Sequence, residues 1–341
     1  MIFMGNKLRI GILGCANIAE KYSIAAFKSL INAELVCIAS RNPEKAKNFA
    51  QKHGIEPENY NSLIERKDID VVYIPLPVGL HEEWVIKAAN AGKHVICEKS
   101  LTHDLDSAKR MVEACRKNSV ALFENFMCNF HPQHEKVLSL LNSGAIGIPF
   151  LFQGFYGFPP FPENDIRYDK ELGGGSLNDA GCYTVFMSRK ILQSEPVAVT
   201  CSLVKGEQKE VDVIGSALLK FPEGGSALIA FGLNQVYQNN YLVWGSKGLI
   251  RVNRAYPIPP NMKPQIEILK NENSRETITP INAPAANHFE LSFQNFCGVV
   301  IKTDLKRINE AYETVLQQAR VMEAMRISSR EQRMVEMKEF G

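Results

Sequence analysis

Short apolar runs alternate with amphipathic segments over the first 125 residues of the chain. Five runs have the length of strands and are apolar almost throughout: LRIGIL (8–13), ELVCIA (34–39), DVVYIP (70–75), HVICE (94–98) and ALFEN (121–125). The segments between them carry apolar positions at spacings of three and four, as helices do, over residues 17–31, 43–53, 81–91 and 104–118. Strands that are apolar on both faces belong in a parallel sheet covered by helices. The pattern therefore predicts an α/β domain with a doubly wound parallel sheet over residues 1–126.

The pattern changes after residue 126. A helix is expected to begin at His131-Pro132, and a Pro- and Gly-rich loop at 157–175 precedes a second helix at about 178–193. From 196 to 280, short strands separated by FPEGG, WGSKG and YPIPP predict an extended, mostly antiparallel sheet. Helices at 287–301 and 305–326 and an edge strand in RMVEM complete the predicted elements. Residues 127–341 are thus expected to form one α+β domain with a large open sheet, for substrate binding and oligomerisation.

Composition excludes several classes of protein. The 39 basic and 37 acidic residues are mixed along the chain, which gives no electrostatic footprint for nucleic acid. Neither a signal peptide nor an apolar run of about 18 residues is present, so no membrane association is expected. The eight cysteines are widely spaced and form no C-x-x-C pair, which indicates reduced thiols in a cytoplasmic protein. No His/Glu cluster has the spacing of metal ligands, so no metal is predicted.

The turn after the first strand is a candidate for binding a dinucleotide pyrophosphate at the start of a helix. Aligned with the Rossmann fingerprint G-x-G-x-x-G, the segment GILGCANIAEK places Gly14, Ala16 and Ala19 at the three small-residue positions. Only the first is glycine, and a simple strand–turn–helix would have a similar sequence. The predicted contacts with the cofactor in this turn are Gly14, Cys15, Ala16, Asn17 and Ile18. For Cys15, a space-filling role is the favoured interpretation.

The end of the second strand indicates which cofactor is bound. An NAD-binding domain places Asp or Glu there to hold the ribose 2′-hydroxyl. This chain instead has Ser40 and Arg41, followed by Lys45. A hydroxyl, a guanidinium and an ammonium suit a 2′-phosphate, which favours NADP (NADPH). The alternative is that Arg41 and Lys45 are a solvated helix start, which would leave the cofactor preference open.

Four segments of the chain carry a further signal: GILGCANIA, IPLPVGLHEEWVIKAANAGKHVICEKS, FENFMCNFHPQ and GGGSLNDAGCYTV. On these motifs the chain resembles, over essentially its whole length, the glucose-fructose oxidoreductase, inositol dehydrogenase and rhizopine-catabolism (Gfo/Idh/MocA) family. The family has a Glu-Lys-Pro motif whose lysine lies beside the nicotinamide and the substrate carbonyl. Here the triplet is Glu98-Lys99-Ser100, so the proline is lost and a cis bond cannot be assumed. Asn129 stands where related enzymes usually carry Arg.

The resemblance implies further site residues. His81 would lie near the nicotinamide ribose, or would be a helix residue without a ligand, and Glu98 would bond the ribose or the carboxamide. The other cofactor contacts expected from these motifs are Leu76, Pro77 and Asn125. On the helix at 178–193 the family carries Asp followed four residues later by His or Tyr, here Asp179 and Tyr183. Tyrosine at this position resembles the branch with nucleotide-sugar 3-ketoreductases, xylose dehydrogenases and dimeric dihydrodiol dehydrogenases. The glycines at 173–175 would let the backbone approach a ligand.

These residue types suit carbonyl reduction. A ketone needs a hydride at carbon and a proton at oxygen, and a phenol next to a positive charge can supply the proton. Tyr183 is the favoured donor and Lys99 its activator, although Lys99 could stabilise the oxyanion or donate the proton itself. Asp179 would orient the tyrosine or contact a substrate hydroxyl.

The run VWGSKGLIRVNRAYPIPP resembles a segment of nucleotide-sugar ketoreductases. The sequence therefore predicts an NADP-dependent oxidoreductase that reduces a keto sugar, which could be nucleotide-linked, and that assembles as a homodimer or homotetramer. The alternatives are a xylose-type free-sugar dehydrogenase, a trans-dihydrodiol dehydrogenase, and a non-catalytic sensor that binds NADP.

Overall fold

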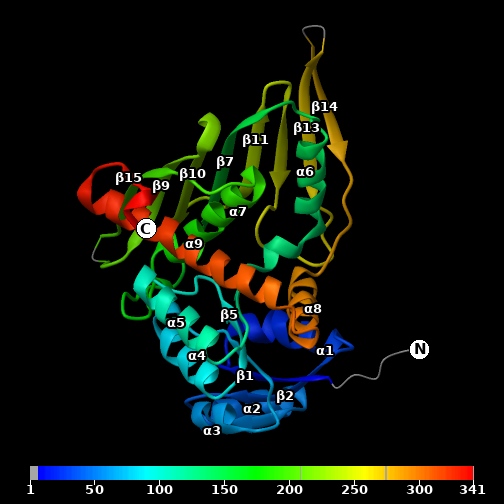
Figure 1. The fold of residues 1–341 in the computed structure, drawn as a ribbon, viewed down its shortest axis with the longest axis vertical. Coiled ribbons are helices and arrows are strands. Elements are labelled where there is room, and N and C mark those ends of the chain that lie inside the picture. The colour runs from blue at the N-terminus through cyan, green and yellow to red at the C-terminus, as the bar shows by residue number, and fades with distance from the viewer. Residues whose placement is uncertain (1–6, 208, 273–274, 341) are drawn as a thin grey trace. The chain divides into compact units, whose positions relative to one another are not determined.

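The computed structural model describes residues 7–207, 209–272 and 275–340. The chain divides into two compact units, which are described separately (Figure 1). Unit 1 contains residues 7–126 and Phe289–Leu316, and unit 2 contains Met127–His288 and residues 317–340. The predicted domain boundary after residue 126 coincides with a unit boundary, but Phe289–Leu316 belongs with unit 1. Neither composition nor periodicity marks this return of the chain.

Unit 1 is built on a six-stranded parallel sheet in the order β3-β2-β1-β4-β5-β6. The strands are β1 (Leu8–Leu13), β2 (Ala33–Ala39), β3 (Glu56–Glu58), β4 (Val71–Ile74), β5 (His94–Glu98) and β6 (Leu122–Asn125). The connecting helices are α1 (Ile24–Ser29), α2 (Pro43–His53), α3 (Tyr60–Glu65), α4 (His81–Asn90) and α5 (Leu105–Lys117), with a π-helical turn at Ala19–Ser23 and a 3₁₀ turn at Val78–Leu80. The predicted doubly wound sheet is confirmed. The sequence analysis did not predict β3 and α3, because a polar three-residue edge strand and a two-turn helix have too little periodicity.

Helix α8 (His288–Ile301) explains why the late segment belongs to unit 1. Phe293 stacks on Phe27 of α1 with ring centroids 4.0 Å apart, and it meets the Tyr73 ring edge-on at 5.4 Å. Phe27, Tyr73 and Phe293 are fully buried. Aromatic burial of this size fixes α8 on the sheet. The boundary with unit 2 falls inside α9 (Leu305–Glu331).

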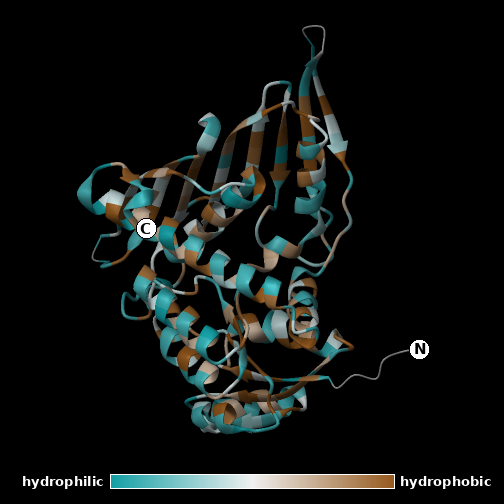
Figure 2. Cartoon of the chain, in the orientation of Figure 1, coloured by the Kyte–Doolittle hydropathy of each residue, from teal (hydrophilic) through white to brown (hydrophobic). Residues whose placement is uncertain are grey.

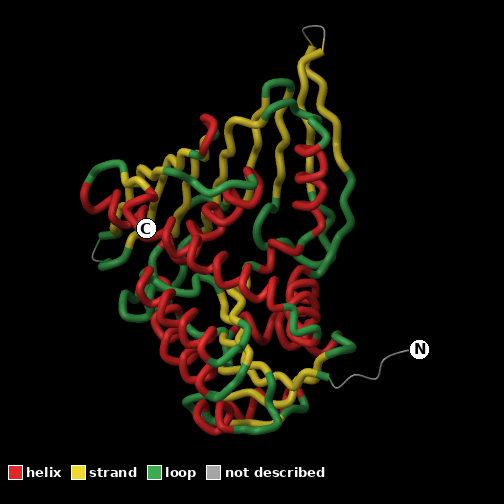
Figure 3. Tube along the Cα trace, in the orientation of Figure 1, coloured by secondary structure: helices red, strands yellow, loops and turns green. Residues whose placement is uncertain are grey.

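Unit 2 contains a nine-stranded sheet in the order β14-β13-β12-β11-β7-β10-β9-β8-β15 (Figure 3). Its strands are β7 (Pro149–Phe158), β8 (Ala198–Lys205), β9 (Asp212–Lys220), β10 (Ser226–Leu233), β11 (Gln238–Gly245), β12 (Gly248–Asn253), β13 (Gln265–Glu272), β14 (Arg275–Ile281) and β15 (Val335–Glu336). Its helices are α6 (Pro132–Asn142) and α7 (Cys182–Leu192), with a π-helical turn at Leu177–Gly181 and 3₁₀ turns at Met127–Phe130, Ile166–Tyr168, Pro222–Gly224 and Met337–Phe340. The β7–β10 ladder is parallel and the other described ladders are antiparallel. The prediction of a mostly antiparallel sheet with an edge strand in RMVEM is confirmed.

The two faces of the nine-stranded sheet differ. One face is packed against α7 and the π-helical turn. Along β11, buried positions alternate with more exposed ones, as expected for a strand with one covered face. The strands of this sheet carry both hydrophobic and hydrophilic residues (Figure 2). Directly paired positions on the other face form an apolar row across five strands: Leu151, Trp244, Leu249, Leu269 and Ile278. Trp244 and Ile278 are 50% and 53% exposed. We call these five residues the apolar row.

No helix formed by the described residues is long and apolar enough to cross a membrane. All eight cysteines are buried thiols, as predicted. Among the described residues, no three His, Cys, Asp or Glu side chains gather in a metal-binding group. The absence of a bound metal remains a prediction.

Three buried histidines lie at the start of α6 and next to it. His131 caps the helix by accepting a hydrogen bond from the Gln133 amide, and its ring lies edge-on to His288. His134 Nδ1 is 3.0 Å from the Tyr241 hydroxyl. Burial lowers the pKa of His131 to about 4 and that of His288 to about 3, and it lowers the pKa of His134 well below its usual range. All three imidazoles are therefore neutral near pH 7.

We expect these histidines to make the fold acid-sensitive. In the unfolded chain they bind protons below about pH 6.5, whereas the folded protein resists protonation of His131 until about pH 4, so stability falls as the pH drops through this window. For His131 alone the loss reaches about 3 kcal/mol near pH 4. Thermal melts between about pH 7.5 and 5 should fall less steeply for His131→Phe than for the wild type. Equal slopes would refute this origin of the acid sensitivity.

Candidate active site

The turn after β1 contains a glycine with a positive φ. Gly14 has a φ of +134°, and a Cβ there would lie 2.7 Å from a methyl carbon of Leu76. Only glycine takes this conformation readily. The turn thus brings two predicted cofactor residues, Gly14 and Leu76, into contact. Asn17 is exposed and Ala16 and Ile18 are half-buried, so backbone and side chains of the turn can reach a ligand.

Cys15 points into unit 1 instead of towards a ligand. Its side chain is buried, and its Sγ faces the carbonyl oxygens of Ala39 and Lys45 at 3.9 and 4.0 Å. Burial raises the pKa of the thiol. The space-filling interpretation of this side chain is therefore the one that the geometry favours, although its backbone remains in the turn.

The end of β2 presents two cations at the surface. Arg41 and Lys45 are exposed, while the buried Ser40 hydroxyl accepts a hydrogen bond from the Asn42 amide. The Asn42 side chain caps α2 by accepting from the amides of Glu44 and Lys45. Asn42 followed by Pro43 is the local signal in the sequence that marks this helix start. The cap fixes where Arg41 leaves the strand.

Cofactor preference is expected to depend on Arg41. Arg41→Ala should raise the dissociation constant of NADPH roughly 10-fold or more, since a charge-assisted hydrogen bond contributes about 1.5–3 kcal/mol. NADH binding should hardly change, because NADH has no 2′-phosphate. Fluorescence titration with both cofactors measures the effect. Lys47→Ala, at another exposed cation of α2, is the matched control. Equal weakening of both cofactors, or a wild type that prefers NADH, would contradict the assignment.

His81, at the start of α4, joins two loops at the carboxyl edge of the sheet. It is completely buried. Its Nε2 lies 2.7 Å from the carbonyl of Leu76, and its Nδ1 lies 3.0 Å from that of Leu101 and 3.1 Å from that of Ser100. Burial lowers the pKa of the imidazole. A neutral imidazole carries one N–H, so His81 lies between the loops after β4 and β5 and donates to one of them at a time, and its contact with the cofactor stays a prediction. Pro77 lies in the first of these loops, where its carbonyl accepts from the Leu80 amide.

Glu98, the last residue of β5, is a buried carboxyl group. Its Oε1 accepts hydrogen bonds from the Tyr73 hydroxyl at 2.8 Å and from the Asn125 amide at 2.7 Å. Burial raises the pKa of the carboxyl, while these hydrogen bonds and the charge of Lys99 oppose the rise. The structure thus brings Glu98 and Asn125 together, and the sequence gives no sign of this contact. The structure also adds Tyr73, which looked like a strand residue in the apolar run DVVYIP.

Lys99 follows Glu98 and is half-buried. The Lys99–Ser100 peptide bond is cis, although residue 100 is not proline. Beyond it, the Leu101 amide donates to Glu124 Oε1 on β6 at 2.8 Å, and the carbonyls of Ser100 and Leu101 face His81. The segment that carries Lys99 is therefore tied to β6 and to α4.

Unit 2 carries the other two predicted catalytic residues. Asp179 lies in the π-helical turn and Tyr183 in the first turn of α7. Asp179 accepts a hydrogen bond from Arg167 Nε at 2.6 Å, and Arg167 also pairs with Asp165 at 3.0 Å. Tyr183 is 3% exposed and its hydroxyl donates to the Met127 sulfur at 3.5 Å. Its ring packs against those of Tyr156 and Tyr256.

Arg167 could not be singled out from the sequence, because it lies in the Pro- and Gly-rich segment that predicts only a loop. The glycines before the π-helical turn also have a reason other than a ligand. Gly175 has a φ of +113°, and a Cβ there would lie 2.6 Å from Asp212 Oδ1. Asp212 in turn accepts from the Ser176 hydroxyl and the Leu177 amide. Gly175 therefore makes room for a carboxylate of the protein that caps the turn.

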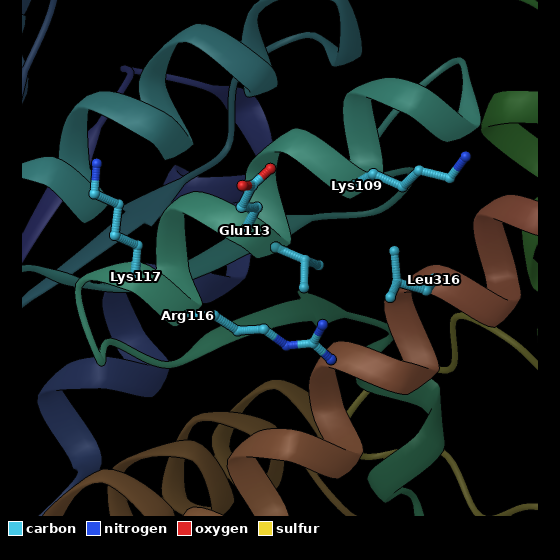
Figure 4. A pocket seen from close by; sticks show the side chains of 6 residues that line it. Lys109, Glu113, Arg116, Lys117 and Leu316 are labelled. Atoms are coloured by element: carbon cyan, nitrogen blue, oxygen red, sulfur yellow. The ribbon is translucent and has the colours of Figure 1, made fainter.

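A surface hollow of about 410 Å³ on unit 1 includes none of these residues in its lining (Figure 4). It is lined by Lys109, Val112, Glu113, Arg116, Lys117 and Leu316. Lys109 and Arg116 are paired with acidic side chains, and Lys109 and Lys117 point away from each other. These cations do not converge on a common point, so the hollow is not a candidate anion site.

The glycine turn on a doubly wound sheet and the second, α+β unit define the class of Rossmann-type oxidoreductases. Residues 8–126 match the model of the oxidoreductase family with an NAD-binding Rossmann fold, and residues 134–251 match the GFO/IDH/MocA C-terminal domain. The chain belongs to the Gfo/Idh/MocA family of oxidoreductases, as its motifs predicted.

Among the relatives is dTDP-3,4-didehydro-2,6-dideoxy-alpha-D-glucose 3-reductase of Actinomadura kijaniata, which is 36% identical over 327 residues, 96% of this chain and 97% of that protein. D-xylose 1-dehydrogenase (NADP(+)) 2 of Haloferax volcanii is 34% identical over 255 residues, 74% of this chain and 78% of the other. The crystal structure of KijD10, a 3-ketoreductase from Actinomadura kijaniata, with NADP and TDP-benzene is similar with a TM-score of 0.89 and 36% identity, covering 95% of this chain and 98% of that chain. Solved variants of KijD10 carry a single lysine or tyrosine replacement.

Proposed function

We propose that this chain is an NADPH-dependent ketoreductase that acts on a keto sugar linked to a nucleotide. The observation that carries the substrate class is similarity over nearly the full length of both chains to a reductase of a dTDP-linked keto sugar. The predicted motifs at residues 98–100 and 179–183 support the chemistry. The alternatives are a free-sugar or dihydrodiol dehydrogenase, and a sensor that binds NADP without turnover.

The residues of unit 1 fit the cofactor. Gly14 gives the turn after β1 a positive φ and lets it pack against Leu76, and Arg41 and Lys45 offer exposed cations for a 2′-phosphate. The remaining proposed contacts are Cys15, Ala16, Asn17, Ile18, Ser40, Leu76, Pro77, His81, Glu98 and Asn125. When bound, NADPH supplies the hydride to the carbonyl carbon.

In the proposed mechanism the protein supplies the proton and stabilises the developing charge. The Tyr183 hydroxyl gives its proton to the carbonyl oxygen as the carbon gains the hydride, so that the ketone becomes a secondary alcohol. The Lys99 ammonium stabilises the oxygen on which negative charge develops and favours loss of the phenolic proton. Asp179, held by Arg167, which also pairs with Asp165, orients the substrate or the tyrosine.

The deciding experiment is a substrate panel. NADPH oxidation is followed with free and nucleotide-linked keto sugars, and NADP reduction with aldoses and trans-dihydrodiols. Turnover that is fastest with a nucleotide-linked keto sugar would support the proposal. Fastest turnover with xylose or a dihydrodiol would replace it with the corresponding alternative. Tight NADPH binding without turnover of any substrate would favour the sensor.

We further propose a reduced, cytoplasmic location and a homodimer or homotetramer in which the apolar row faces a second copy. A partly exposed apolar row across five strands on one sheet face is typical of an interface between subunits. Phe150 extends it by packing against Trp244, with ring centroids 5.2 Å apart.

Wild-type protein is therefore expected to sediment as a dimer or tetramer at micromolar concentration. A Trp244→Glu, Leu249→Glu double variant should shift it to monomer, because the charges would be buried without partners. Ile31→Glu, at an 87% exposed residue of unit 1, is the control and should leave the assembly unchanged. A wild type that is strictly monomeric would contradict the proposal.

A further inference from the structure

Hydrogen bonds from two neighbouring strands hold the same oxygen of Glu98. The Tyr73 hydroxyl on β4 and the Asn125 amide on β6 both donate to Oε1, at 2.8 and 2.7 Å. Because β4 and β6 flank β5 in the sheet, the carboxyl group is fixed from both sides. The three residues are at most 7% exposed, so water does not compete for these contacts.

Two further hydroxyl groups hold the donors in place. Ser23, at the end of the π-helical turn before α1, has its Oγ 2.8 Å from the Tyr73 hydroxyl. Ser292 on α8 donates to Asn125 Oδ1 at 2.7 Å. This bond fixes the orientation of the amide, because Oδ1 must face Ser292 while Nδ2 faces Glu98. A helix far along the chain thus takes part in a network at the carboxyl edge of the sheet.

The network can accommodate Glu98 in either protonation state. With Glu98 ionised, Ser23 donates to Tyr73 and Tyr73 donates to the carboxylate. With Glu98 protonated, the carboxyl can donate to Tyr73, Tyr73 to Ser23, and Ser23 to the Ile18 carbonyl at 3.4 Å. Changing the donor–acceptor direction along Glu98, Tyr73 and Ser23 moves only the hydrogens of the hydroxyl and carboxyl groups. Both forms are therefore hydrogen-bonded, but the donors favour the ionised form, because hydrogen bonds to a charged carboxylate are stronger than those to a neutral carboxyl group.

We propose that Tyr73 and Ser292 are positioning residues for the reaction: through Glu98 they fix the carboxylate next to Lys99 and keep it ionised. The proposal rests on the proposed function in taking Lys99 as a catalytic residue. Glu98 and Lys99 are adjacent and interact by charge. An ionised Glu98 favours the protonated ammonium that the developing oxyanion requires.

The titratable groups around Glu98 come from four elements. Tyr73 on β4 and the residues Cys97 and Lys99 at the end of β5 interact with Glu98 directly. Glu124 on β6 interacts by charge with Cys97, and His81 on α4 interacts by charge with Lys99. Burial raises the pKa values of Tyr73 and Cys97 well above their usual ranges, so neither loses its proton near pH 7. Burial also raises the pKa of Glu98, which makes its ionisation depend on the donors.

The test measures the pH dependence of turnover in Tyr73→Phe and Ser292→Ala. Loss of the Tyr73 hydroxyl removes one donor to the carboxylate, so Glu98 should protonate at higher pH. We expect the acidic limb of the kcat profile to move up by about one to two pH units, the scale of one charge-assisted hydrogen bond. Turnover at pH values within the shifted limb should fall, with the KM for NADPH nearly unchanged. Ser292→Ala should give a smaller shift in the same direction, and Ser292→Thr should restore the wild-type profile.

Matched controls separate this role from a loss of stability. Tyr312 is a second buried tyrosine of unit 1, and its hydroxyl donates to the Val120 carbonyl. Ser107 is a buried serine of α5. Tyr312→Phe and Ser107→Ala should lower the melting temperature by amounts similar to those of the test variants but should leave the acidic limb in place.

A second readout needs no substrate. The infrared band of the protonated Glu98 carboxyl, assigned as the band that Glu98→Gln lacks, is titrated in wild type and variants. Its midpoint should rise in Tyr73→Phe and stay constant in Tyr312→Phe. Equal midpoints in these two variants would overturn the inference even if the enzyme reduces keto sugars. A shifted midpoint in a protein that turns over no substrate would refute the proposed function alone.

Discussion

Lys99→Ala is expected to lower turnover at least about 10²-fold, the scale of one lost transition-state contact. The variant loses the ammonium group that stabilises the developing oxyanion and favours transfer of the phenolic proton. NADPH binding should largely survive, because the proposed contacts with the phosphates come from the turn at Gly14 and from the cations at the end of β2. Single-turnover kinetics with the best substrate and a fluorescence titration with NADPH measure the two effects separately.

Lys87→Ala provides the control for this variant, because Lys87 is an exposed lysine of α4 whose salt bridge is with Glu83. Its turnover should equal that of the wild type. Lys99→Arg keeps the charge in a bulkier group and should retain part of the activity if charge is what matters. Wild-type turnover in Lys99→Ala would remove Lys99 from the mechanism.

Tyr183→Phe is expected to lower turnover by about 10²- to 10⁴-fold if the proton passes through its hydroxyl. The replacement keeps the ring and its packing against Tyr156 and Tyr256. The hydroxyl donates to the Met127 thioether, which is a weak acceptor. The pH profile of the residual activity and the kcat of the variant are the measurements.

The matched control is Tyr241→Phe, at a fully buried tyrosine of the same unit that contacts His134. It should lower stability but not turnover. Near wild-type turnover in Tyr183→Phe together with an inactive Lys99→Ala would make the lysine or a bound water the proton donor. The role proposed for Tyr183 would then have to be withdrawn.

Periodicity alone predicted most secondary structure correctly. The apolar run 8–13 is β1, and the helical pattern at 43–53 is α2. In both cases the pattern of apolar residues that predicts the element lies within a short stretch of sequence. The helix expected at 178–193 begins as a π-helical turn at Leu177, because Asp212 from β9 caps that turn and Gly175 admits its carboxylate. A cap from a distant strand leaves no pattern in the helix sequence itself.

The candidate site was predictable where its residues lie in contiguous motifs. Gly14, Arg41, Glu98-Lys99 and Asp179-Tyr183 could be singled out because turn chemistry and spacing are local properties. Tyr73, Arg167 and Ser292 could not. Tyr73 reads as one more apolar strand residue, Arg167 lies in a Pro- and Gly-rich segment, and Ser292 lies on a late helix with no chemical motif.

The sequence by itself determined the alternation of strands and helices, the doubly wound sheet, the family and the residues of its motifs, since each depends on residues close together in the chain. Only the tertiary structure decided that Phe289–Leu316 joins unit 1, that Ser292 orients Asn125, and that Glu98 is held by Tyr73. Ser292 and Asn125 are 167 positions apart, and they meet because burial of Phe293 against Phe27 fixes α8 on the sheet. Packing of large apolar side chains has no directional code in the sequence, so the polar contacts that it creates appear only once the chain has folded.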